Sequence, residues 1–301
     1  MCDSTALVRL LGEGGSEAAS VPSNGSPVRI FVINLDDDTQ RLVETKSRLA
    51  ALDLSFERFP ACRGANLPDW LKQQFFDEAG RPLSTLSPGE IGCYASHLAV
   101  ARRILDEDID DPVLVLEDDG DFSADLPDVL KRLQELPPDW EIVRMSSKLD
   151  TAYIPVRRIT SASTLVRYWY PPAGTTGYLI NKAGAGRFLA AARQRTRPVD
   201  QDLRRFWETR LVTYGVVPRL IVWRDVPSSI DKVSAGTARA KRLTFEPTPS
   251  EMQLIRREGI RTFGLYTALR CIIANKIARK LRRRRSEQAI NKWLRVGRAT
   301  W

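Results

Sequence analysis

Three consecutive carboxylates, Glu117, Asp118 and Asp119, are the side chains in this sequence best suited to chemistry. They follow the apolar run Val113–Leu116 and are followed by Gly120. A short apolar run bounded in this way is typical of a strand buried on both faces. Ligands of open α/β sheets bind beyond the carboxyl ends of the strands, and hard divalent cations prefer carboxylate oxygens together with substrate phosphates. The pattern favours a metal–diphosphate site; the alternative is an acidic turn without a ligand.

The segments before this strand predict a β–α–β opening that would position the carboxylates. Val28–Leu35 is an apolar run typical of a strand, a helix is expected from about Thr39 to Leu52, and Phe56–Phe59 predicts a second strand. Such alternation is typical of a nucleotide-binding α/β sheet. The sequence G-x-G-x-x-G is absent, so the dinucleotide fingerprint is excluded. The predicted fold class is α/β, a Rossmann-type mixed sheet flanked by helices.

A helix start is encoded just before the acidic strand. Ser87-Pro88-Gly89-Glu90 has the form of a capping box with proline at the first helical position. Glu90 and His97 are seven residues apart, so the helix places them two turns apart on roughly one face. His97 is the single histidine of the chain. It is a candidate for substrate contact, and the alternative is a structural histidine.

Two further candidate segments follow the acidic strand. Gly174 and Gly177 lie in a loop that leads into a strand. Glycines let a ligand approach the backbone closely, although a simple turn needs them as well. Asp200 follows Pro198 and is placed to begin a helix late in the folded part.

Basic charge is concentrated at the end of the chain. The formal net charge is +9, yet the segment 256–301 alone holds fourteen lysines and arginines against two acidic residues. Apolar residues repeat at helical spacing over Ile260–Arg285, with basic residues between them, which predicts a basic amphipathic helix. This pattern favours binding to an anionic membrane surface. Packing of the apolar face on the body and a nucleic-acid patch are the alternatives, and nucleic acid is the least favoured.

The remaining composition bounds the class of protein. The four cysteines are scattered without a C-x-x-C arrangement, so a zinc site of the usual Cys/His spacing is not expected and a reducing compartment is. Neither a signal peptide nor an apolar run of about 18 residues is found. Residues 1–27 are rich in small and polar residues, which predicts a disordered extension. The expected organisation is 1–27, a domain over 28–245, and a basic helical tail over 246–301.

Four segments in this order resemble a known family. They are Val32-Ile33-Asn34-Leu35 with Arg41; Pro88-Gly89-Glu90-Ile91-Gly92-Cys93 with Ser96-His97; Leu114-Val115-Leu116-Glu117-Asp118-Asp119; and Gly174-Thr175-Thr176-Gly177-Tyr178 followed by Pro198-Val199-Asp200. The sequence is similar to glycosyltransferase family 25, the lipooligosaccharide galactosyltransferases of bacteria and their collagen-galactosyltransferase relatives. The resemblance covers about Val28 to Asp231.

The resemblance implies a GT-A-like fold, a nucleotide-sugar donor such as UDP-galactose, Mn²⁺ or Mg²⁺, and inversion at the sugar carbon. The metal is expected at Asp119 with Asp118. The expected donor-binding residues are Asn34, Leu35, Arg41, Arg63, His97, Glu117, Asp118 and Gly177. One displacement with inversion needs one general base. Asp200 is the first candidate for that base, because acceptor-side groups are expected late in the fold, and Glu90 is the second.

The resemblance and the basic helix also lead to expectations about the acceptor and about where the protein is located. The expected acceptor is a lipooligosaccharide or another glycan, free or lipid-linked, as in lipopolysaccharide biosynthesis. The basic helix would hold the enzyme at the inner face of the membrane as a peripheral, cytoplasmic protein. Two other functions remain open. One is a different metal-dependent enzyme of diphosphates, although the Lys- or Gly-rich phosphate loop expected of it is not found. The other is a non-catalytic membrane or nucleic-acid adaptor, although the acidic cluster is intact.

Overall fold

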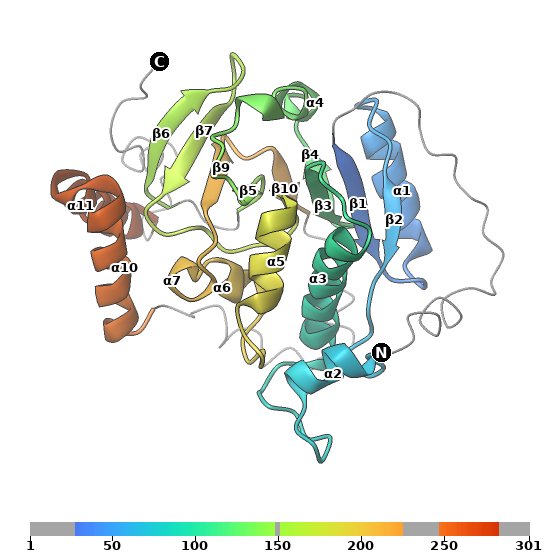
Figure 1. The fold of residues 1–301 in the computed structure, drawn as a ribbon. Coiled ribbons are helices and arrows are strands. Elements are labelled where there is room, and N and C mark those ends of the chain that lie inside the picture. The colour runs from blue at the N-terminus through green and yellow to red at the C-terminus, as the bar shows by residue number, and fades with distance from the viewer. Residues whose placement is uncertain (1–27, 148–150, 225–246, 283–301) are drawn as a thin grey trace.

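A mixed sheet of eight strands forms the centre of the protein (Figure 1). The structure is a computed structural model that describes residues 28–147, 151–224 and 247–282. The strands of the sheet are β1 (Arg29–Asn34), β2 (Glu57–Pro60), β3 (Val113–Glu117), β5 (Ile142–Arg144), β6 (Tyr153–Arg158), β7 (Thr164–Tyr168), β8 (Gly177–Ile180) and β9 (Thr213–Val217). Their order across the sheet is β2-β1-β3-β8-β5-β9-β7-β6. A separate antiparallel pair joins β4 (Gly120–Phe122) to β10 (Ile221–Trp223).

Helices cover both faces of this sheet. They are α1 (Thr39–Ala50), α2 (Asp69–Phe75), α3 (Pro88–Asp106), α4 (Leu126–Leu130), the 3-10 helix η1 (Leu133–Glu135), α5 (Lys182–Ala190), α6 (Val199–Leu203), α7 (Phe206–Thr209), α10 (Pro249–Phe263) and α11 (Leu265–Arg282). Apolar residues of α2, α3, α5 and α6 form one core with one face of the sheet. Residues of α1, α4 and η1 form a second core with the other face. The expected α/β class, a mixed sheet flanked by helices, is confirmed.

The strand directions bring several chain segments to one edge of the sheet. β1 pairs in parallel with β2 and β3, and β5 pairs in parallel with β9. β8 lies antiparallel between β3 and β5, so it begins where those two strands end. In this register Tyr178 of β8 stands opposite Val115 on one side and Arg144 on the other. The acidic loop after β3 therefore shares its edge with the end of β5 and the start of β8.

The predicted capping box of α3 is confirmed. The Ser87 side chain accepts from the Glu90 amide, and the Glu90 carboxylate accepts from the Ser87 amide. One turn further on, α3 lies directly against the loop that follows β2. A Cβ atom on Gly92 would stand 2.6 Å from the carbonyl oxygen of Cys62, so only glycine permits this approach. These contacts fix α3 along the face of the sheet.

The prediction of one continuous helix over Ile260–Arg285 is wrong. The described chain forms two helices that meet at Gly264, whose φ of +77° lies in the region that favours glycine and ends α10. Residues beyond 282 lie outside the described part, as does the predicted disordered extension over 1–27. Among the described helices, none has the length and apolar character needed to cross a bilayer.

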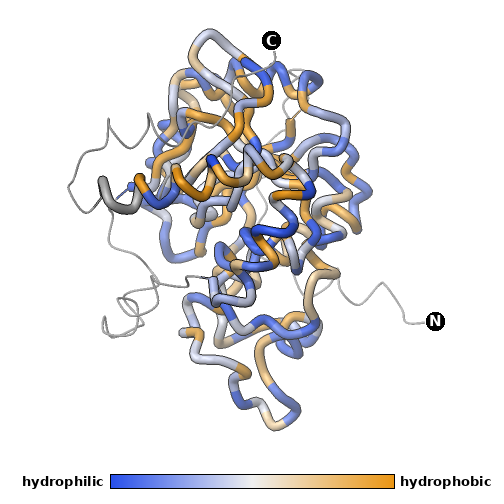
Figure 2. The backbone as a smooth tube through the Cα atoms, turned by 90° about the vertical axis from the view of Figure 1, so that its left-hand side faces the viewer, coloured by the Kyte–Doolittle hydropathy of each residue, from blue (hydrophilic) through white to orange (hydrophobic). Residues whose placement is uncertain are grey.

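The two helices pack partly on the body of the protein. Their buried residues join Ala152, Trp169 and Trp207 in a third apolar core; those residues are Ile255, Ala268, Cys271 and Ala274. The other side of α11 stays open, because Tyr266 is 73% exposed and Ile273 is 54% exposed. Figure 2 views the molecule from this side and shows hydrophobic and hydrophilic residues alternating along these helices. The body therefore buries only part of the apolar surface of α10 and α11.

Candidate functional site

Asp118 lies at the centre of a polar network beyond β3. Asn34, at the end of β1, donates to it across 2.7 Å. Arg41 of α1 is 3.0 Å from its other carboxylate oxygen and 3.5 Å from Asp119. Burial raises the pKa of Asp118, and the charge of Arg41 opposes that rise. Both carboxylate oxygens of Asp118 are therefore engaged by protein groups.

Asp119 differs from Asp118 in having an oxygen to spare. Its Oδ1 atom is buried and has no hydrogen-bond partner within the part of the chain that the structure describes. Burial, followed by the charge of Glu117, raises the pKa of Asp119 to about 7. A buried carboxylate oxygen without a donor is suited to a hard cation. Of the two predicted metal ligands, Asp119 thus fits the role better in this arrangement.

Glu117 is tied to the helix face of the sheet. His97 of α3 has its Nε2 atom 3.3 Å from the Glu117 carboxylate and its Nδ1 atom 2.9 Å from the Tyr178 hydroxyl. His97 and Tyr178 are each 1% exposed. The hydroxyl of Thr175 donates to the same carboxylate oxygen of Glu117. The network fixes Glu117 from α3 and from the loop before β8.

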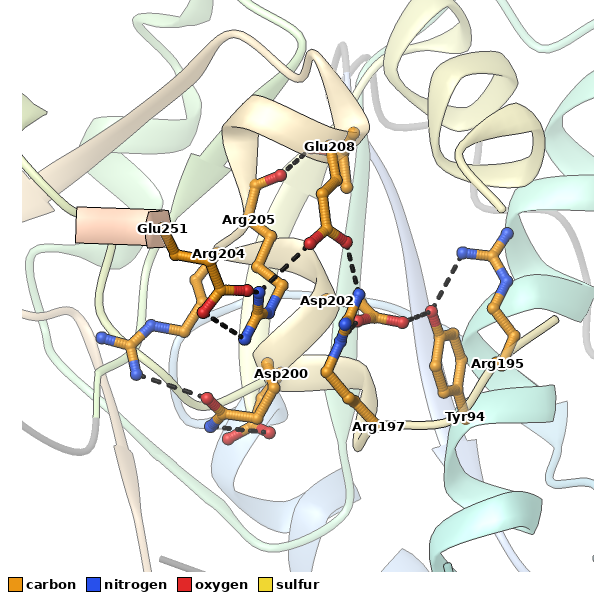
Figure 3. A network of polar contacts seen from close by, with 11 residues as sticks. Tyr94, Arg195, Arg197, Asp200, Asp202, Arg204, Arg205, Glu208 and Glu251 are labelled. Atoms are coloured by element: carbon orange, nitrogen blue, oxygen red, sulfur yellow. Dashed lines mark hydrogen bonds and ion pairs between the residues drawn. The ribbon is translucent and has the colours of Figure 1, made fainter. Parts of the chain in front are cut away.

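That loop also holds the predicted general base. Gly174 donates its backbone N–H to Asp200 across 3.2 Å, and the neighbouring Thr175 holds Glu117. Gly174 has a φ of +108°, a conformation that favours glycine. Figure 3 shows Asp200 at the start of α6, with Asp202 on the same short helix and Arg204 at its C-cap. Two adjacent loop residues therefore bring together carboxylates that lie far apart in the sequence.

Arg144 adds a buried positive charge to this edge. It ends β5, is 1% exposed, and none of its three guanidinium nitrogens has a hydrogen-bond partner among the described residues. Burial lowers its pKa, whereas the negative charge of Asp200 raises it. The ring of Tyr168 covers Gly215 on the neighbouring strand, so closely that a Cβ there would lie 2.3 Å from the ring. An unpartnered guanidinium in this position is suited to an anionic or hydroxyl-rich ligand.

A cavity of about 180 Å³ opens beyond the ends of β5 and β9. Its lining includes Ser147, Tyr153, Tyr168, Pro172 and Arg219. Aromatic rings, proline and hydroxyl groups of this kind suit a sugar. Since Tyr168 lines the cavity and also covers Gly215, the strand partner of Arg144, the cavity lies near the end of β5 that carries Arg144.

The other residues predicted from the sequence make contacts of a different kind. Glu90 takes part in the cap of α3, and Leu35 accepts from Asp38 in the turn after β1. Arg63 is paired with Asp37. Gly177 lies under Ile221 of β10, where a Cβ would stand 2.2 Å from the isoleucine side chain. In this arrangement these four residues support the walls of the site and its neighbouring turns.

Three residues of the site were missed by sequence reasoning: Arg144, Thr175 and Tyr178. Arg144 could have been found from the sequence, because it follows the apolar residues Ile142 and Val143 and precedes Met145 in a predicted strand. Arginine is rarely buried in such a strand unless it has a partner or a ligand. Thr175 and Tyr178 lie in a segment that carries the family resemblance, but the sequence indicated no role for either side chain. Their roles depend on the placement of β8 between β3 and β5.

Comparison with known proteins relates this arrangement to a family. The family description "Glycosyltransferase family 25 (LPS biosynthesis protein)" matches residues 28–203, more than half of the chain. Human procollagen galactosyltransferase 2 is 29% identical over 121 residues, which are 38% of this chain and 18% of that protein. The human inactive glycosyltransferase 25 family member 3 is 28% identical over 159 residues, 45% of this chain and 25% of that protein.

A solved structure, that of a glycosyltransferase involved in the glycosylation of the major capsid of PBCV-1, is also similar. It has 12% sequence identity and a TM-score of 0.34, over 71% of this chain and 96% of the other. The chain spans between 18% and 31% of the length of the first procollagen galactosyltransferases that it matches. The matched segment 28–203 contains the acidic loop, α3, β8 and Asp200. The chain belongs to glycosyltransferase family 25.

Proposed function

We propose that this chain is an inverting glycosyltransferase that moves a hexose, with galactose the first candidate, from a UDP-sugar to a glycan acceptor. The observation that carries the proposal is the Gly174–Thr175 loop, which holds Glu117 of the acidic edge and Asp200 through adjacent residues. Transfer needs one group of charges for the departing diphosphate and one base for the acceptor. The loop contacts both the acidic edge, through Glu117, and the candidate base Asp200.

A divalent cation, Mn²⁺ or Mg²⁺, fits this site at Asp119. The buried Oδ1 atom lacks a partner among the described residues, and a hard cation would supply one. When bound, the ion would neutralise charge on the diphosphate leaving group. Asn34 and Arg41 hold Asp118 in place beside Asp119. Asp118 would therefore add negative charge next to the ion while its own oxygens stay bound to these two residues.

Asp200 is proposed to accept the proton of the attacking acceptor hydroxyl. As that oxygen bonds to the anomeric carbon, the bond from this carbon to the phosphate oxygen breaks, and its electron pair leaves with the diphosphate. The backbone N–H of Gly174 orients the carboxylate, and the buried guanidinium of Arg144 interacts electrostatically with it. Tyr153 and Tyr168 of the cavity would contact the acceptor sugar.

A transfer assay with UDP-galactose, a glycan acceptor and Mn²⁺ tests the proposal. We expect Asp119→Asn and Asp200→Asn each to lower kcat by about 100-fold or more, since each removes a group used in the transition state. The exposed carboxylate Asp106 at the end of α3 provides the control, and Asp106→Asn should retain full activity.

Free galactose without acceptor-dependent product would indicate the rival diphosphate enzyme. Wild-type protein that turns over no nucleotide sugar would indicate a non-catalytic adaptor, as the name of the human inactive relative illustrates.

We also propose that α11 contacts an anionic membrane surface at the cytoplasmic face. Its side away from the body exposes Leu265, Tyr266, Leu269 and Ile273 by between 50% and 73%. Arg270 lies among these residues, and basic charge attracts such a surface. Vesicles containing phosphatidylglycerol should therefore pull down the wild type, whereas neutral vesicles should not. Leu269→Ser with Ile273→Ser should abolish the binding, and retained binding or a preference for nucleic acid would contradict the proposal.

A further inference from the structure

We propose that Cys93, His97 and Glu117 form a site for a zinc-class divalent cation, separate from the hard-cation site at Asp119. A thiol sulfur, a ring nitrogen and a carboxylate oxygen of these residues all lie within 4.8 Å of one another. Zinc binds sulfur at ~2.3 Å and nitrogen or oxygen at ~2.1 Å, so tetrahedral ligand atoms stand about 3.3–3.7 Å apart. His97 Nε2 and Glu117 Oε1 are 3.3 Å apart. The cluster thus needs only a small contraction around an ion.

Two rigid elements supply the three ligands. Cys93 and His97 are four residues apart on α3, which places them on one face of the helix. Glu117 is the last residue of β3, on the sheet that this helix covers. Cysteine and histidine spacing alone did not indicate a zinc site, because the third ligand is a carboxylate brought in by the fold.

A second layer of contacts already orients the ligands. The Tyr178 hydroxyl lies 2.9 Å from His97 Nδ1, so Nδ1–H can donate to it and leave the Nε2 lone pair facing Glu117. Thr175 donates its hydroxyl to Glu117. Metal-binding histidines and carboxylates are commonly held by such outer contacts, which fix the ring tautomer and the direction of the ligand atom.

The charges of the ligand set select the cation. A Cys93 thiolate and the Glu117 carboxylate balance a dication, while His97 stays neutral. The bound site carries no net charge, which lowers the cost of placing it beside a histidine that is 1% exposed. Thiolate and imidazole favour zinc-class ions, whereas Mg²⁺ prefers oxygen ligands throughout. The sulfur therefore distinguishes this site from the one at Asp119.

A cation here would tie the middle of α3 to the end of β3. It would fix Glu117, and through it the acidic loop, while three protein ligands leave a fourth position open. Cation binding at these three ligands does not depend on sugar transfer. Its test accordingly uses binding rather than activity.

Titration of the metal-stripped full chain with Co²⁺ tests the site, because thiolate coordination produces a charge-transfer band in the near ultraviolet. The wild type should develop this band and saturate at one equivalent. Cys93→Ser should abolish it, and Tyr178→Phe should weaken the affinity by about tenfold through loss of the outer contact. Cys62→Ser, which changes a partly buried thiol outside the cluster, should keep the band. Asp119→Asn should keep it too, which separates the two metal sites.

A second readout uses thiol chemistry on the unaltered protein. Zn²⁺ should slow alkylation of Cys93, measured by peptide mass spectrometry, and leave the rate at Cys62 unchanged. Circular dichroism of each variant shows whether it has folded. A wild-type protein without the cobalt band, a band that survives Cys93→Ser, or alkylation of Cys93 at the same rate with and without Zn²⁺ would each overturn the proposal.

Discussion

Asp119 has a buried carboxylate oxygen and Arg144 a buried guanidinium, and these polar atoms have no hydrogen-bond partner among the described residues. A buried polar group in this state costs about 1–3 kcal/mol of folding stability, and more when it is charged. The two residues carry opposite charges and lie at the same edge of the sheet, on either side of β8. Proteins keep such destabilising groups mainly at functional sites, where a bound ligand supplies the missing hydrogen bonds. The loss of folding stability at these two residues therefore supports a role in ligand binding.

Replacing Arg144 tests this interpretation. Arg144→Met removes the buried charge and keeps an unbranched apolar side chain, so we expect a gain of about 1–2 kcal/mol in the free energy of unfolding. The same variant should bind the sugar substrates more weakly. Chemical denaturation and ligand titration measure the two effects. The exposed Arg157→Met on β6 is the control, with stability within about 0.5 kcal/mol of the wild type. A marked loss of stability in Arg144→Met would show that the guanidinium is compensated within the protein.

At the scale of elements, α3 positions Cys93 and His97, two of the three proposed ligands of the zinc-class cation. Its first turn is fixed by the capping box and its second by the close approach of Gly92 to the loop after β2. Such an approach between two backbone segments leaves no space for relaxation, because neither partner is a flexible side chain. The position of His97 relative to Glu117 therefore depends on a glycine that touches neither residue.

Gly92→Ala should destabilise the protein by about 2–3 kcal/mol through overpacking against this loop. It should also weaken Co²⁺ binding at the cluster. Gly186 of α5 offers a matched control, because a Cβ there meets nothing within 4 Å. Gly186→Ala should raise stability by about 0.5–1 kcal/mol through its effect on helix propensity. Thermal unfolding measures both, and equal behaviour of the two variants would contradict the packing argument.

The elements also show what sequence patterns could predict. β1, β3 and the cap of α3 were predicted because each depends on residues adjacent in the chain. The insertion of β8 between β3 and β5 could not be predicted, since it depends on contacts between distant segments. The acidic loop was accordingly found in the sequence, whereas the partnership of Tyr178 with His97 was not. The break at Gly264 was missed because the apolar repeat continues across it.

At the scale of the whole molecule, the C-terminal helices attach to the body through an apolar core and specific polar contacts. Arg205 of the body pairs with Glu251 of α10 (Figure 3). Gly259 faces Trp169, and a Cβ there would stand 2.1 Å from the indole ring. The Ala152 N–H also donates to Asn275 of α11 across 3.0 Å, and the third apolar core completes the attachment.

Gly259→Val should displace α10 and α11 from the body while the sheet stays folded. The added side chain would overlap the Trp169 ring, which packs in the apolar core between these helices and the body. Hydrogen exchange should become faster in residues 249–277 and remain unchanged in β1, β3 and α3. Uniformly faster exchange across the sheet would contradict this division of the molecule.

Nucleotide binding tests most directly the proposed metal-assisted nucleotide-sugar site at the carboxyl edge of the sheet. The measurement is the thermal shift of the full chain with UDP, GDP, CMP or ADP, each with and without Mn²⁺. Binding at a hundredfold excess over Kd adds about 2.7 kcal/mol to stability. We expect UDP to raise the unfolding midpoint only with Mn²⁺, and Asp119→Asn to lose that shift. A wild-type protein whose unfolding midpoint does not move with any of the four nucleotides would contradict a nucleotide-sugar site at this edge.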